Sequence, residues 1–216
     1  MPSHYGGFWD FTSDMKHQDT AYTPLPLGAH TDTTYYGQSA GLQLFHCLKQ
    51  SETGGESLLV DGYRAAQILR TEHLDSYRIL SRTPVPSHSA GDPNYFFQVT
   101  SKPVLCHDLV GTGELIQVRW NNDDRSAMNE FPHEHGVDGF YEAIRRWDEI
   151  LRRKDSEYWF QLVPGRAVIF DNWRVLHGRN SFVGERRLCG AYISRDAFKS
   201  RFLTTNVERE KLLMEI

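Results

Sequence analysis

The chain has 216 residues, with 24 Lys and Arg against 28 Asp and Glu and a formal net charge of -4. This length fits one domain with its own core, and a weakly acidic chain without a clustered basic face excludes a mainly polyanionic partner, so we expect no nucleic acid and no membrane surface as partners. Three widely spaced cysteines, Cys47, Cys106 and Cys189, predict neither a disulfide framework nor a cysteine zinc site, and they favour a reducing compartment.

The first half of the chain predicts edge strands, a hairpin and a broken helix. Residues 1–40 are rich in aromatics, Gly, Pro, Thr and Asp and lack helical periodicity, so we expect loops and short edge strands. Residues 41–49 and the apolar run 57–62 flank a Gly-Gly turn, which predicts a hairpin of two strands. Apolar residues at three- and four-residue spacing predict a helix in two pieces over residues 63–80, ended by the sequence TPVP.

The second half predicts short strands around one amphipathic helix. Strands are expected at 95–101, 103–109, 114–120, 157–165, 166–178 and 186–196. A helix is expected over residues 137–156, with Phe140, Ile144, Trp147 and Leu151 on one face. Many short strands, two substantial helices and no regular βαβ alternation favour a sandwich or barrel, and a jelly roll in particular.

The sequence LGAHTDTTYYG at residues 27–37 raises the question of a metal site. His30 and Asp32 are two residues apart, so on an extended strand both side chains point to one face. Alone, such a pair is more often a surface histidine beside a turn-capping aspartate. His177 is a candidate third ligand because it ends an apolar strand before a Gly turn, although a structural histidine fits there too. Two histidines and one carboxylate form the facial triad of non-haem Fe(II) oxygenases, while a zinc hydrolase remains an alternative.

Arg186 follows His177 on the next predicted strand. An iron oxygenase that consumes 2-oxoglutarate needs a fixed cation for the distal carboxylate, and arginine matches a carboxylate with two hydrogen bonds. The alternative for Arg186 or its neighbour Arg187 is a solvated charge on an edge strand. A competing zinc site at His133 and His135 lies in a Pro/Gly-bounded loop without a clear third ligand.

Several long blocks of the sequence resemble one family. The blocks are AYTPLPLGAHTDTTYY, GLQLFHCLKQSETGGESLLVDGYRAA, VRWNNDDR and PGRAVIFDNWRVLHGR with RRLCGAYISRD. From Tyr5 to Asp196 the chain is similar to the trimethyllysine dioxygenases, in the taurine-dioxygenase-like group that also contains gamma-butyrobetaine dioxygenase. The resemblance implies a mainly β fold with inserted helices, the double-stranded β-helix (jelly roll) of oxygenases that use Fe(II), 2-oxoglutarate and O2, with ascorbate helping to keep the iron reduced.

The resemblance also implies roles for individual residues. His30, Asp32 and His177 match the iron ligands, Arg186 matches the arginine that holds the distal carboxylate of 2-oxoglutarate, and Ser57 matches a hydroxyl residue beside it. Aromatic residues that enclose a quaternary ammonium, by attraction of the cation to ring faces, correspond to Tyr5, Trp9, Tyr22 and Tyr192. Positions that contact the rest of the substrate correspond to Asn121, Asn122 and Asp19, of which Asp19 favours an α-ammonium over a carboxylate.

The implied reaction is 3-hydroxylation of N6,N6,N6-trimethyllysine, the first step of carnitine biosynthesis, with release of succinate and CO2. A gamma-butyrobetaine hydroxylase and a truncated, inactive ligand-binding paralogue are the alternatives. Because relatives carry an N-terminal domain before the segment that matches Tyr5, residues 1–216 are expected to be one catalytic domain, truncated at its N-terminus. The sequence contains no targeting segment and no apolar run of membrane length, which favours an intracellular protein of the mitochondrial matrix or cytoplasm; a homodimer is one assembly that the resemblance allows.

Overall fold

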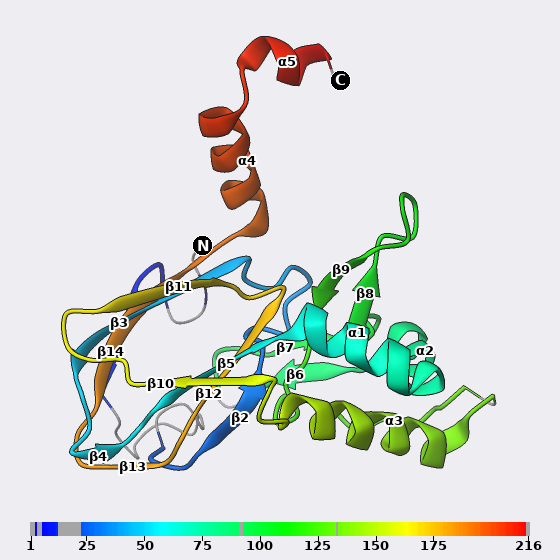
Figure 1. Ribbon diagram of the computed structural model, residues 1–216, viewed down its shortest axis with the longest axis horizontal. Helices are drawn as coiled ribbons and strands as arrows, with labels where there is room; N and C mark the ends of the chain where they lie inside the picture. The colour runs from blue at the N-terminus through cyan, green and yellow to red at the C-terminus, as the bar shows by residue number, and fades with distance from the viewer. Residues whose placement is uncertain (1–2, 4–5, 13–22, 91–92, 133, 215–216) are drawn as a thin grey trace.

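Two four-stranded antiparallel sheets form the centre of the computed structural model, which describes residues 3, 6–12, 23–90, 93–132 and 134–214 (Figure 1). The first, called the β3 sheet, has the order β1 (Trp9–Thr12), β14 (Arg187–Ile193), β3 (Leu42–Lys49) and β11 (Ala167–Asp171). The second, called the β12 sheet, has the order β10 (Glu157–Phe160), β5 (Ser57–Asp61), β12 (Val175–Arg179) and β2 (Leu27–His30). This is the mainly β, jelly-roll arrangement that the sequence predicted.

The strands expected within the first 40 residues are edge strands. Strand β1 lies at the edge of the β3 sheet and β2 at the edge of the β12 sheet. In the β1–β14 ladder Trp9 lies opposite Gly190, and a Cβ at that glycine would collide with the Trp9 ring and with the carbonyl oxygen of Leu44. The absence of a side chain at Gly190 therefore lets the Trp9 ring cover the inner face of β14.

The hairpin predicted from residues 41–49 and 57–62 is wrong. Strand β3 pairs with β14 and β11, whereas β5 pairs with β10 and β12, so the two strands belong to different sheets. The connection passes through Gly54 and Gly55, whose φ angles of 71° and 75° lie in the left-handed region, and through the short strand β4 (Thr53–Gly54), which pairs with β13 (Phe182–Val183). The Gly-Gly segment thus carries the chain from one sheet to the other. Similarly, the predicted strand 166–178 is two strands, β11 and β12, in different sheets.

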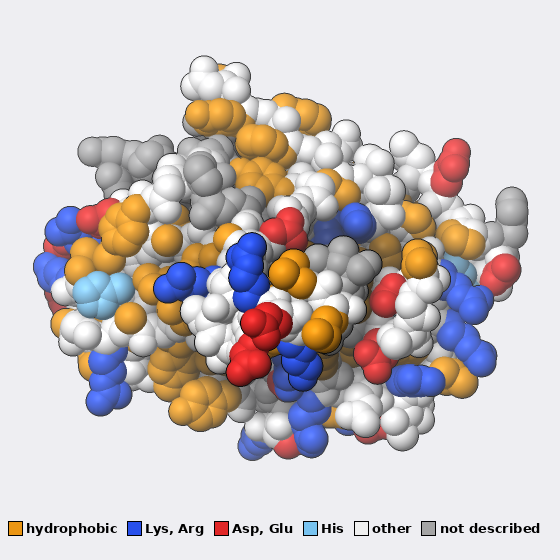
Figure 2. All heavy atoms as spheres, turned by 90° about the horizontal axis from the view of Figure 1, so that it is seen from above, with side chains coloured by type: hydrophobic (Ala, Val, Ile, Leu, Met, Phe, Trp, Pro, Cys, Tyr) orange, Lys and Arg blue, Asp and Glu red, His pale blue; other side chains and the backbone are white. Residues whose placement is uncertain are grey.

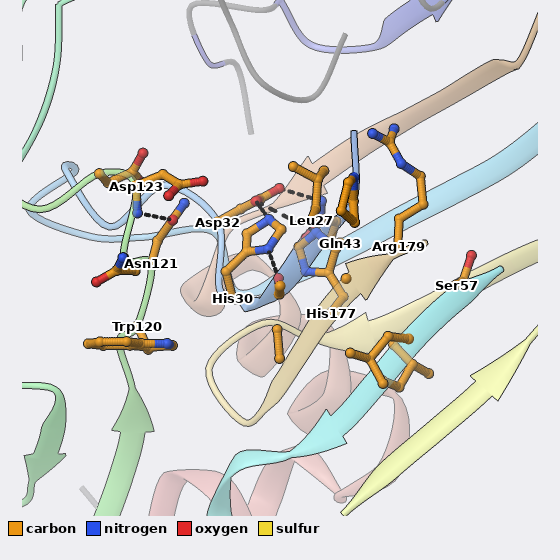
Figure 3. A pocket seen from close by; sticks show the side chains of 18 of the residues that line it. Leu27, His30, Asp32, Gln43, Ser57, Trp120, Asn121, Asp123, His177 and Arg179 are labelled. Atoms are coloured by element: carbon orange, nitrogen blue, oxygen red, sulfur yellow. Dashed lines mark hydrogen bonds and ion pairs between the residues drawn. The ribbon is translucent and has the colours of Figure 1, made fainter. Parts of the chain in front are cut away.

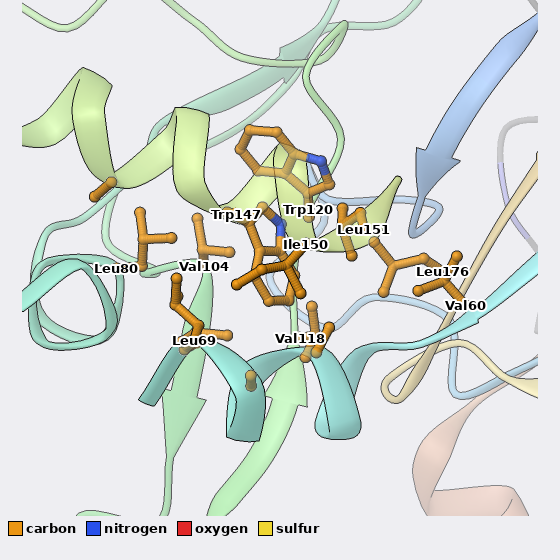
Figure 4. Close-up of a cluster of buried hydrophobic side chains, with 14 of the residues drawn as sticks. Val60, Leu69, Leu80, Val104, Val118, Trp120, Trp147, Ile150, Leu151 and Leu176 are labelled. Atoms are coloured by element: carbon orange, nitrogen blue, oxygen red, sulfur yellow. The ribbon is translucent and has the colours of Figure 1, made fainter. Parts of the chain in front are cut away.

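Three helices pack together beside the β12 sheet and share a core with its outer side chains. The helix predicted over 63–80 is in two pieces, α1 (Gly62–Glu72) and α2 (Leu74–Arg82), and the later predicted helix is α3 (Gly136–Leu151). Side chains alternate across the strands, so Leu58, Val60 and Leu176 point outward into the core that these helices build (Figure 4). Helix α3 contributes Trp147, which is fully buried at the centre of this core.

Two small two-stranded sheets extend the molecule beside these helices. They are formed by β6 (Ser87–Ser89) with β7 (Phe97–Val99), and by β8 (Leu105–His107) with β9 (Leu115–Val118). Three of these strands lie within predicted runs, while β6 was not expected. None of the helices in the described part of the chain is long and apolar enough to cross a membrane.

Two C-terminal helices, α4 (Arg195–Asn206) and α5 (Arg209–Met214), were also not expected, and they project away from the sheets (Figure 1). Ser194 caps α4 by accepting a hydrogen bond from the backbone N–H of Ala197 at 3.2 Å. No residue of either helix is buried, so neither helix packs an apolar face against the sheets. Figure 2 views the molecule from this end and shows basic and acidic side chains intermixed across the face.

Candidate metal centre

His30, Asp32 and His177 converge between the two sheets. His30 ends β2 and lies directly opposite His177 of β12, while Asp32 follows β2 after one residue. The Asp32 Oδ1 atom is 3.4 Å from His30 Nε2 and 3.7 Å from His177 Nε2. Bonds of about 2.0–2.2 Å to a metal ion place neighbouring ligand atoms about 3–3.5 Å apart, so the three atoms are close to the spacing that one ion requires. Among the described residues, these three are the group of potential ligands that meets within 4.8 Å.

The His30 ring is oriented by its own strand. His30 Nδ1 hydrogen-bonds to the carbonyl oxygen of Gly28 at 2.7 Å, which leaves Nε2 facing Asp32. A histidine whose second nitrogen donates to a carbonyl is held in the tautomer that presents a lone pair to a metal. The His177 ring contacts the rings of Phe45 and Phe170, whose centroids are 5.4 and 5.2 Å from its own and 5.8 Å from each other. The His30 ring is therefore oriented by a hydrogen bond, and the His177 ring by packing against two aromatic rings.

Only one oxygen of Asp32 faces the histidines. The other, Oδ2, accepts hydrogen bonds from Gln43 Nε2 at 2.5 Å and from the Tyr192 hydroxyl at 2.7 Å. Gln43 and Tyr192 are Cα partners on the neighbouring strands β3 and β14, and their side chains approach Asp32 from the opposite sheet. The carboxylate is thus held from the side away from the histidines.

The backbone of the Asp32 loop is also constrained. Asn172 Oδ1 accepts from the Asp32 N–H at 2.9 Å, and Asn172 Nδ2 donates to the carbonyl oxygens of Asp32 and Ala40 at 3.1 and 3.0 Å. Thr33 has a φ of 58°, an unfavourable conformation for a β-branched residue, and its hydroxyl accepts from the Ala40 N–H at 2.9 Å. Backbone strain next to a potential ligand is typical of a functional site.

Burial and charge set the protonation of the three groups. Burial would raise the pKa of Asp32, but the charges of His177 and His30 and the Tyr192 hydrogen bond outweigh it, so this pKa lies below its usual range. Burial, together with the charge of His30, lowers the pKa of His177 to about 3. Burial would lower the pKa of His30 as well, but the hydrogen bond and charge of Asp32 outweigh it and raise that pKa. An anionic carboxylate beside a neutral imidazole suits a cation.

A cavity of about 690 Å³ surrounds the three residues. Its walls come from both sheets, from the segment after β9 and from helix α3. Figure 3 shows the segment after β9, with Trp120, Asn121 and Asp123, on one side of the histidines and Ser57 and Arg179 on the other. Arg179 lines one side and Asp123 the other, and Arg145, Asp148 and Arg152 of α3 also line the cavity.

The arginine side contains Arg179 and Arg186, both buried, with Ser57 opposite Arg179 in the β12–β5 ladder. Burial lowers the pKa of both guanidinium groups to about 10, and the charge of Arg186 adds to the effect on Arg179, so both remain cationic at neutral pH. Both groups lie over the Phe182 ring, 4.8 and 5.9 Å from its centroid. Two like charges buried in one region favour binding of an anion there.

Arg187 has a different environment. It pairs with Asp10 through two hydrogen bonds of 2.9 and 2.7 Å, and both side chains are exposed. It does not line the cavity. The solvated charge considered for this pair of arginines therefore applies to Arg187, while Arg186 faces the cavity.

The acidic side is tied to the metal-ligand strand. The Thr31 N–H donates to the Trp120 carbonyl oxygen at 2.7 Å, and the Trp120 N–H donates to the Thr31 hydroxyl at 3.0 Å. Because Thr31 lies between His30 and Asp32, the next residues of this segment, including Asn121 and Asp123, line the cavity beside the site. Asn121 Oδ1 accepts from the Asp123 N–H at 3.1 Å, so its NH2 group is the end that can donate to a ligand.

The aromatic positions expected around a substrate are only partly described. Trp9 and Tyr192 both line the cavity, with ring centroids 6.1 Å apart. Tyr5, Asp19 and Tyr22 lie outside the described residues, as does His133. Asn122 lines the cavity as an exposed residue. His135 Nε2 hydrogen-bonds to the Thr83 hydroxyl at 3.2 Å, away from the cavity.

Gln43, Asn172 and Thr33 support the site and were not predicted from the sequence. The alternation of Leu42 and Leu44 predicts that Gln43 between them faces outward, whereas the structure buries Gln43 on the inner face of β3. No pattern in the sequence signals Asn172 or Thr33, because their roles depend on contacts between segments distant in the chain.

Comparisons with known proteins agree with this geometry. The family described as Taurine catabolism dioxygenase TauD, TfdA family matches residues 1–192. A trimethyllysine dioxygenase from Meyerozyma guilliermondii is 49% identical over 212 residues, which cover 98% of this chain and 53% of the relative. The human protein named Trimethyllysine dioxygenase, mitochondrial, is 42% identical over 203 residues, covering 89% of this chain and 46% of the relative. The chain thus spans about half the length of the curated relatives it matches.

The fold is also found among solved structures. An asparagine oxygenase in complex with Fe(II), 2S,3S-3-hydroxyasparagine and succinate superposes with a TM-score of 0.67 and 17% sequence identity, covering 88% of this chain and 57% of that one. At this identity the likeness bears on the fold alone. It confirms that the two sheets form the double-stranded β-helix expected from the sequence.

Proposed function

Since the chain belongs to the TauD/TfdA family of taurine catabolism dioxygenases, we propose that it is an Fe(II)- and 2-oxoglutarate-dependent hydroxylase of N6,N6,N6-trimethyllysine, acting at C3. The observation that carries this proposal is the convergence of His30, Asp32 and His177 in a cavity that the buried Arg179 and Arg186 also line. The names of the relatives at 42–49% identity direct the choice of substrate.

His30, Asp32 and His177 would hold the iron. Two imidazoles and one carboxylate are the ligand set of non-haem Fe(II) oxygenases, and they leave coordination positions open. When bound, the iron with 2-oxoglutarate and O2 supplies the oxidising power for hydroxylation of a C–H bond, and succinate and CO2 are released. Ascorbate is proposed as the reductant that keeps the metal in its active state. The protein itself binds, orients and shields the reactants.

The arginine side of the cavity would bind the distal carboxylate of 2-oxoglutarate. Arg186 provides a planar, permanently charged donor pair, and the Ser57 hydroxyl adds a further hydrogen bond. Arg179 lies beside them and raises the positive potential, while its Nη2 donates to the carbonyl oxygens of Thr23 and Leu25 at 2.6 and 2.8 Å. Burial of these cations strengthens their attraction to an anion, because the local dielectric constant is low.

The acidic side would bind the amino-acid end of the substrate. In trimethyllysine the reacting C3 is bonded to the α-carbon, so the α-ammonium and α-carboxylate must lie close to the metal. The segment that carries Asn121 and Asp123 is hydrogen-bonded to Thr31, next to two proposed ligands. The Asn121 NH2 group suits the α-carboxylate, with Asn122 nearby, and the Asp123 carboxylate suits the α-ammonium.

The trimethylammonium end would lie farther along the cavity, three methylenes from C3. Trp9 and Tyr192 are proposed to face it, with Tyr5 and Tyr22 completing the cage and Asp19 a second candidate for the α-ammonium. Ring faces attract a cation that cannot donate hydrogen bonds. We further propose that residues 1–216 act as one catalytic unit, that a homodimer is the assembly to test first, and that the compartment is mitochondrial, as in the name of the human relative.

The direct test uses the purified chain with Fe(II), 2-oxoglutarate and ascorbate. Trimethyllysine, gamma-butyrobetaine and unmethylated lysine are supplied separately, and succinate formation and the mass of the organic product are measured. We expect succinate and a singly hydroxylated product from wild type with trimethyllysine. The His30→Ala variant is the matched control and should form neither. Preference for gamma-butyrobetaine would replace the substrate proposed here, and metal binding without turnover of any substrate would favour an inactive ligand-binding paralogue.

A further inference from the structure

Gln43 is an unexpected residue for its position. It is 1% exposed on the inner face of β3, next to Phe45 on the same face and opposite Phe170 in the β3–β11 ladder. Its Oε1 atom is buried without a hydrogen-bond partner among the described residues. A buried amide with an unsatisfied oxygen is costly, so an apolar side chain would serve packing alone better than a glutamine does.

The other end of this amide makes a specific contact. Gln43 Nε2 donates to Asp32 Oδ2, the oxygen that also receives the Tyr192 hydroxyl. Both donors therefore act on one oxygen of the carboxylate, while Oδ1 faces the two Nε2 atoms of His30 and His177. The β3–β14 register holds Gln43 and Tyr192 side by side, so their separation is set by the sheet rather than by either side chain.

We propose that Gln43 and Tyr192 are positioning residues that occupy Oδ2 of Asp32, so that Asp32 offers a bound metal one oxygen and not two. A carboxylate that is free to rotate can bind an ion through both oxygens, which would fill a position needed for another ligand. An ion held by two imidazoles and one carboxylate oxygen would keep coordination positions free for a cosubstrate and O2. The need for free coordination positions rests on the proposed function. The hydrogen bonds from Gln43 and Tyr192 to Asp32 do not depend on it.

Tyr192 would thus act on Asp32 in addition to its expected place near the substrate. Its ring lines the cavity near Trp9, where the family resemblance implies contact with a quaternary ammonium, but its hydroxyl is engaged by Asp32. Removal of the hydroxyl therefore acts on the metal centre and leaves the ring face in place. Gln43 has no expected role in substrate binding, so the two residues can be varied separately.

The test compares three variants by metal binding without any substrate. Gln43→Met keeps a similar volume and removes the amide, and Tyr192→Phe removes only the hydroxyl. Gln117→Met is the matched control, because Gln117 is another buried glutamine, whose Nε2 donates to the Ser39 hydroxyl and not to a proposed metal ligand. Mn(II) affinity is measured by titration calorimetry, Co(II) coordination by absorption spectroscopy, and 2-oxoglutarate affinity on the Mn(II)-loaded protein.

We expect Gln43→Met to weaken Mn(II) binding about 10- to 100-fold, as loss of a hydrogen bond to a metal ligand typically does, and to change the Co(II) spectrum. It should also weaken 2-oxoglutarate binding to the loaded protein. Tyr192→Phe should likewise weaken Mn(II) and 2-oxoglutarate binding and change the Co(II) spectrum. Gln117→Met should change none of these three measurements. Mn(II) affinity within about twofold of wild type together with an unchanged Co(II) spectrum in Gln43→Met would overturn the inference.

If Gln43→Met does not fold, Tyr192→Phe alone decides, and an unchanged Co(II) spectrum in that variant overturns the inference equally. Failure of the proposed function gives a different pattern. A wild-type protein that binds Mn(II) and 2-oxoglutarate but hydroxylates no trimethyllysine would contradict the function and leave the roles of Gln43 and Tyr192 standing.

Discussion

His177 lies directly opposite His30 in the ladder between β12 and β2, and the centroids of their rings are 4.3 Å apart. Antiparallel pairing thus joins two residues that are distant in the sequence. The ladder has a register shift between His177 and Arg179, just beyond the site, and such irregularities redirect the following side chains. Since β2 is an edge strand, its pairing with β12 alone holds His30 in the sheet.

Alanine variants of the three proposed ligands are the first prediction. His30→Ala, Asp32→Ala and His177→Ala should each abolish 2-oxoglutarate turnover, because each removes one of three protein ligands. Circular dichroism should show that the fold is retained, since none of the three belongs to the buried apolar clusters. Wild-type turnover in any one variant would remove that residue from the ligand set.

Metal binding should also be visible in thermal stability. A ligand that binds only the folded state at a hundred times its Kd adds about 2.7 kcal/mol, which in a chain of this size corresponds to about 5–10 °C in Tm. We expect Mn(II) to raise the Tm of wild type and chelator to reverse the change. The same addition should leave the Tm of Asp32→Ala nearly unaltered, and an equal rise in that variant would indicate metal binding elsewhere.

Much of this architecture was predictable because hydrophobic periodicity reports what a segment buries. The face of α3 that carries Phe140 and Trp147 was identified in this way, and both residues are fully buried. Periodicity does not report the partner of a strand. Strands β3 and β5 alternate as hairpin strands do, yet they lie in different sheets, and only the sheet pairing reveals it.

In the candidate site, too, the sequence pointed to individual residues but not to the contacts between the two sheets. The spacing of His30 and Asp32 follows from strand geometry, and the long blocks of similarity pointed to His177 and Arg186. The hydrogen bond from Gln43 to Asp32 depends on the approach of two sheets, which no local pattern records. The distinction between Arg186 and Arg187 likewise required the structure, because adjacent strand residues point to opposite faces and the sequence does not say which face is inward.

Arg186→Ala and Arg187→Ala together test the proposed 2-oxoglutarate site. Arg186→Ala should raise the 2-oxoglutarate concentration needed for half-maximal turnover about ten- to a hundredfold, because a charged hydrogen bond contributes about 1.5–3 kcal/mol. The KM for trimethyllysine should change far less. Arg187→Ala is the control, since its guanidinium pairs with Asp10 on the exposed face of the sheet. Equal 2-oxoglutarate dependence in both variants would shift the assignment to Arg179.

A pH-dependent contribution to stability is predicted at Asp61. This residue caps α1 by accepting from the N–H groups of Tyr63 and Arg64 at 3.0 and 3.3 Å, and it pairs with Arg174 at 2.6 Å. Burial would raise the pKa of Asp61, but the Arg174 and backbone hydrogen bonds outweigh it and lower this pKa. A lowered pKa in the folded state means that the contribution is complete above the unfolded pKa and is lost as the pH falls through the folded one.

Asp61→Ala should therefore lower the free energy of unfolding by about 0.5–2 kcal/mol at neutral pH, the usual contribution of a helix N-cap. The difference in free energy of unfolding from wild type should narrow as the pH falls below about 4. Urea unfolding of both proteins across this range measures it. A difference that is constant with pH would show that packing, and not the charge of Asp61, is responsible.

The last prediction concerns Asp123 and the choice between substrates that share a quaternary ammonium. Trimethyllysine carries an α-ammonium that gamma-butyrobetaine lacks, and Asp123 is an exposed acid on the cavity wall beside the metal-ligand strand. Because an exposed ion pair contributes at most about 1 kcal/mol, Asp123→Asn should lower kcat/KM for trimethyllysine by up to about fivefold. The analogue of trimethyllysine without its α-amino group should react equally with wild type and variant. Glu130→Gln, an exposed acid that does not line the cavity, is the control. An equal loss with both substrates would show that Asp123 does not bind the α-ammonium, and Asp19 would then be the residue to vary.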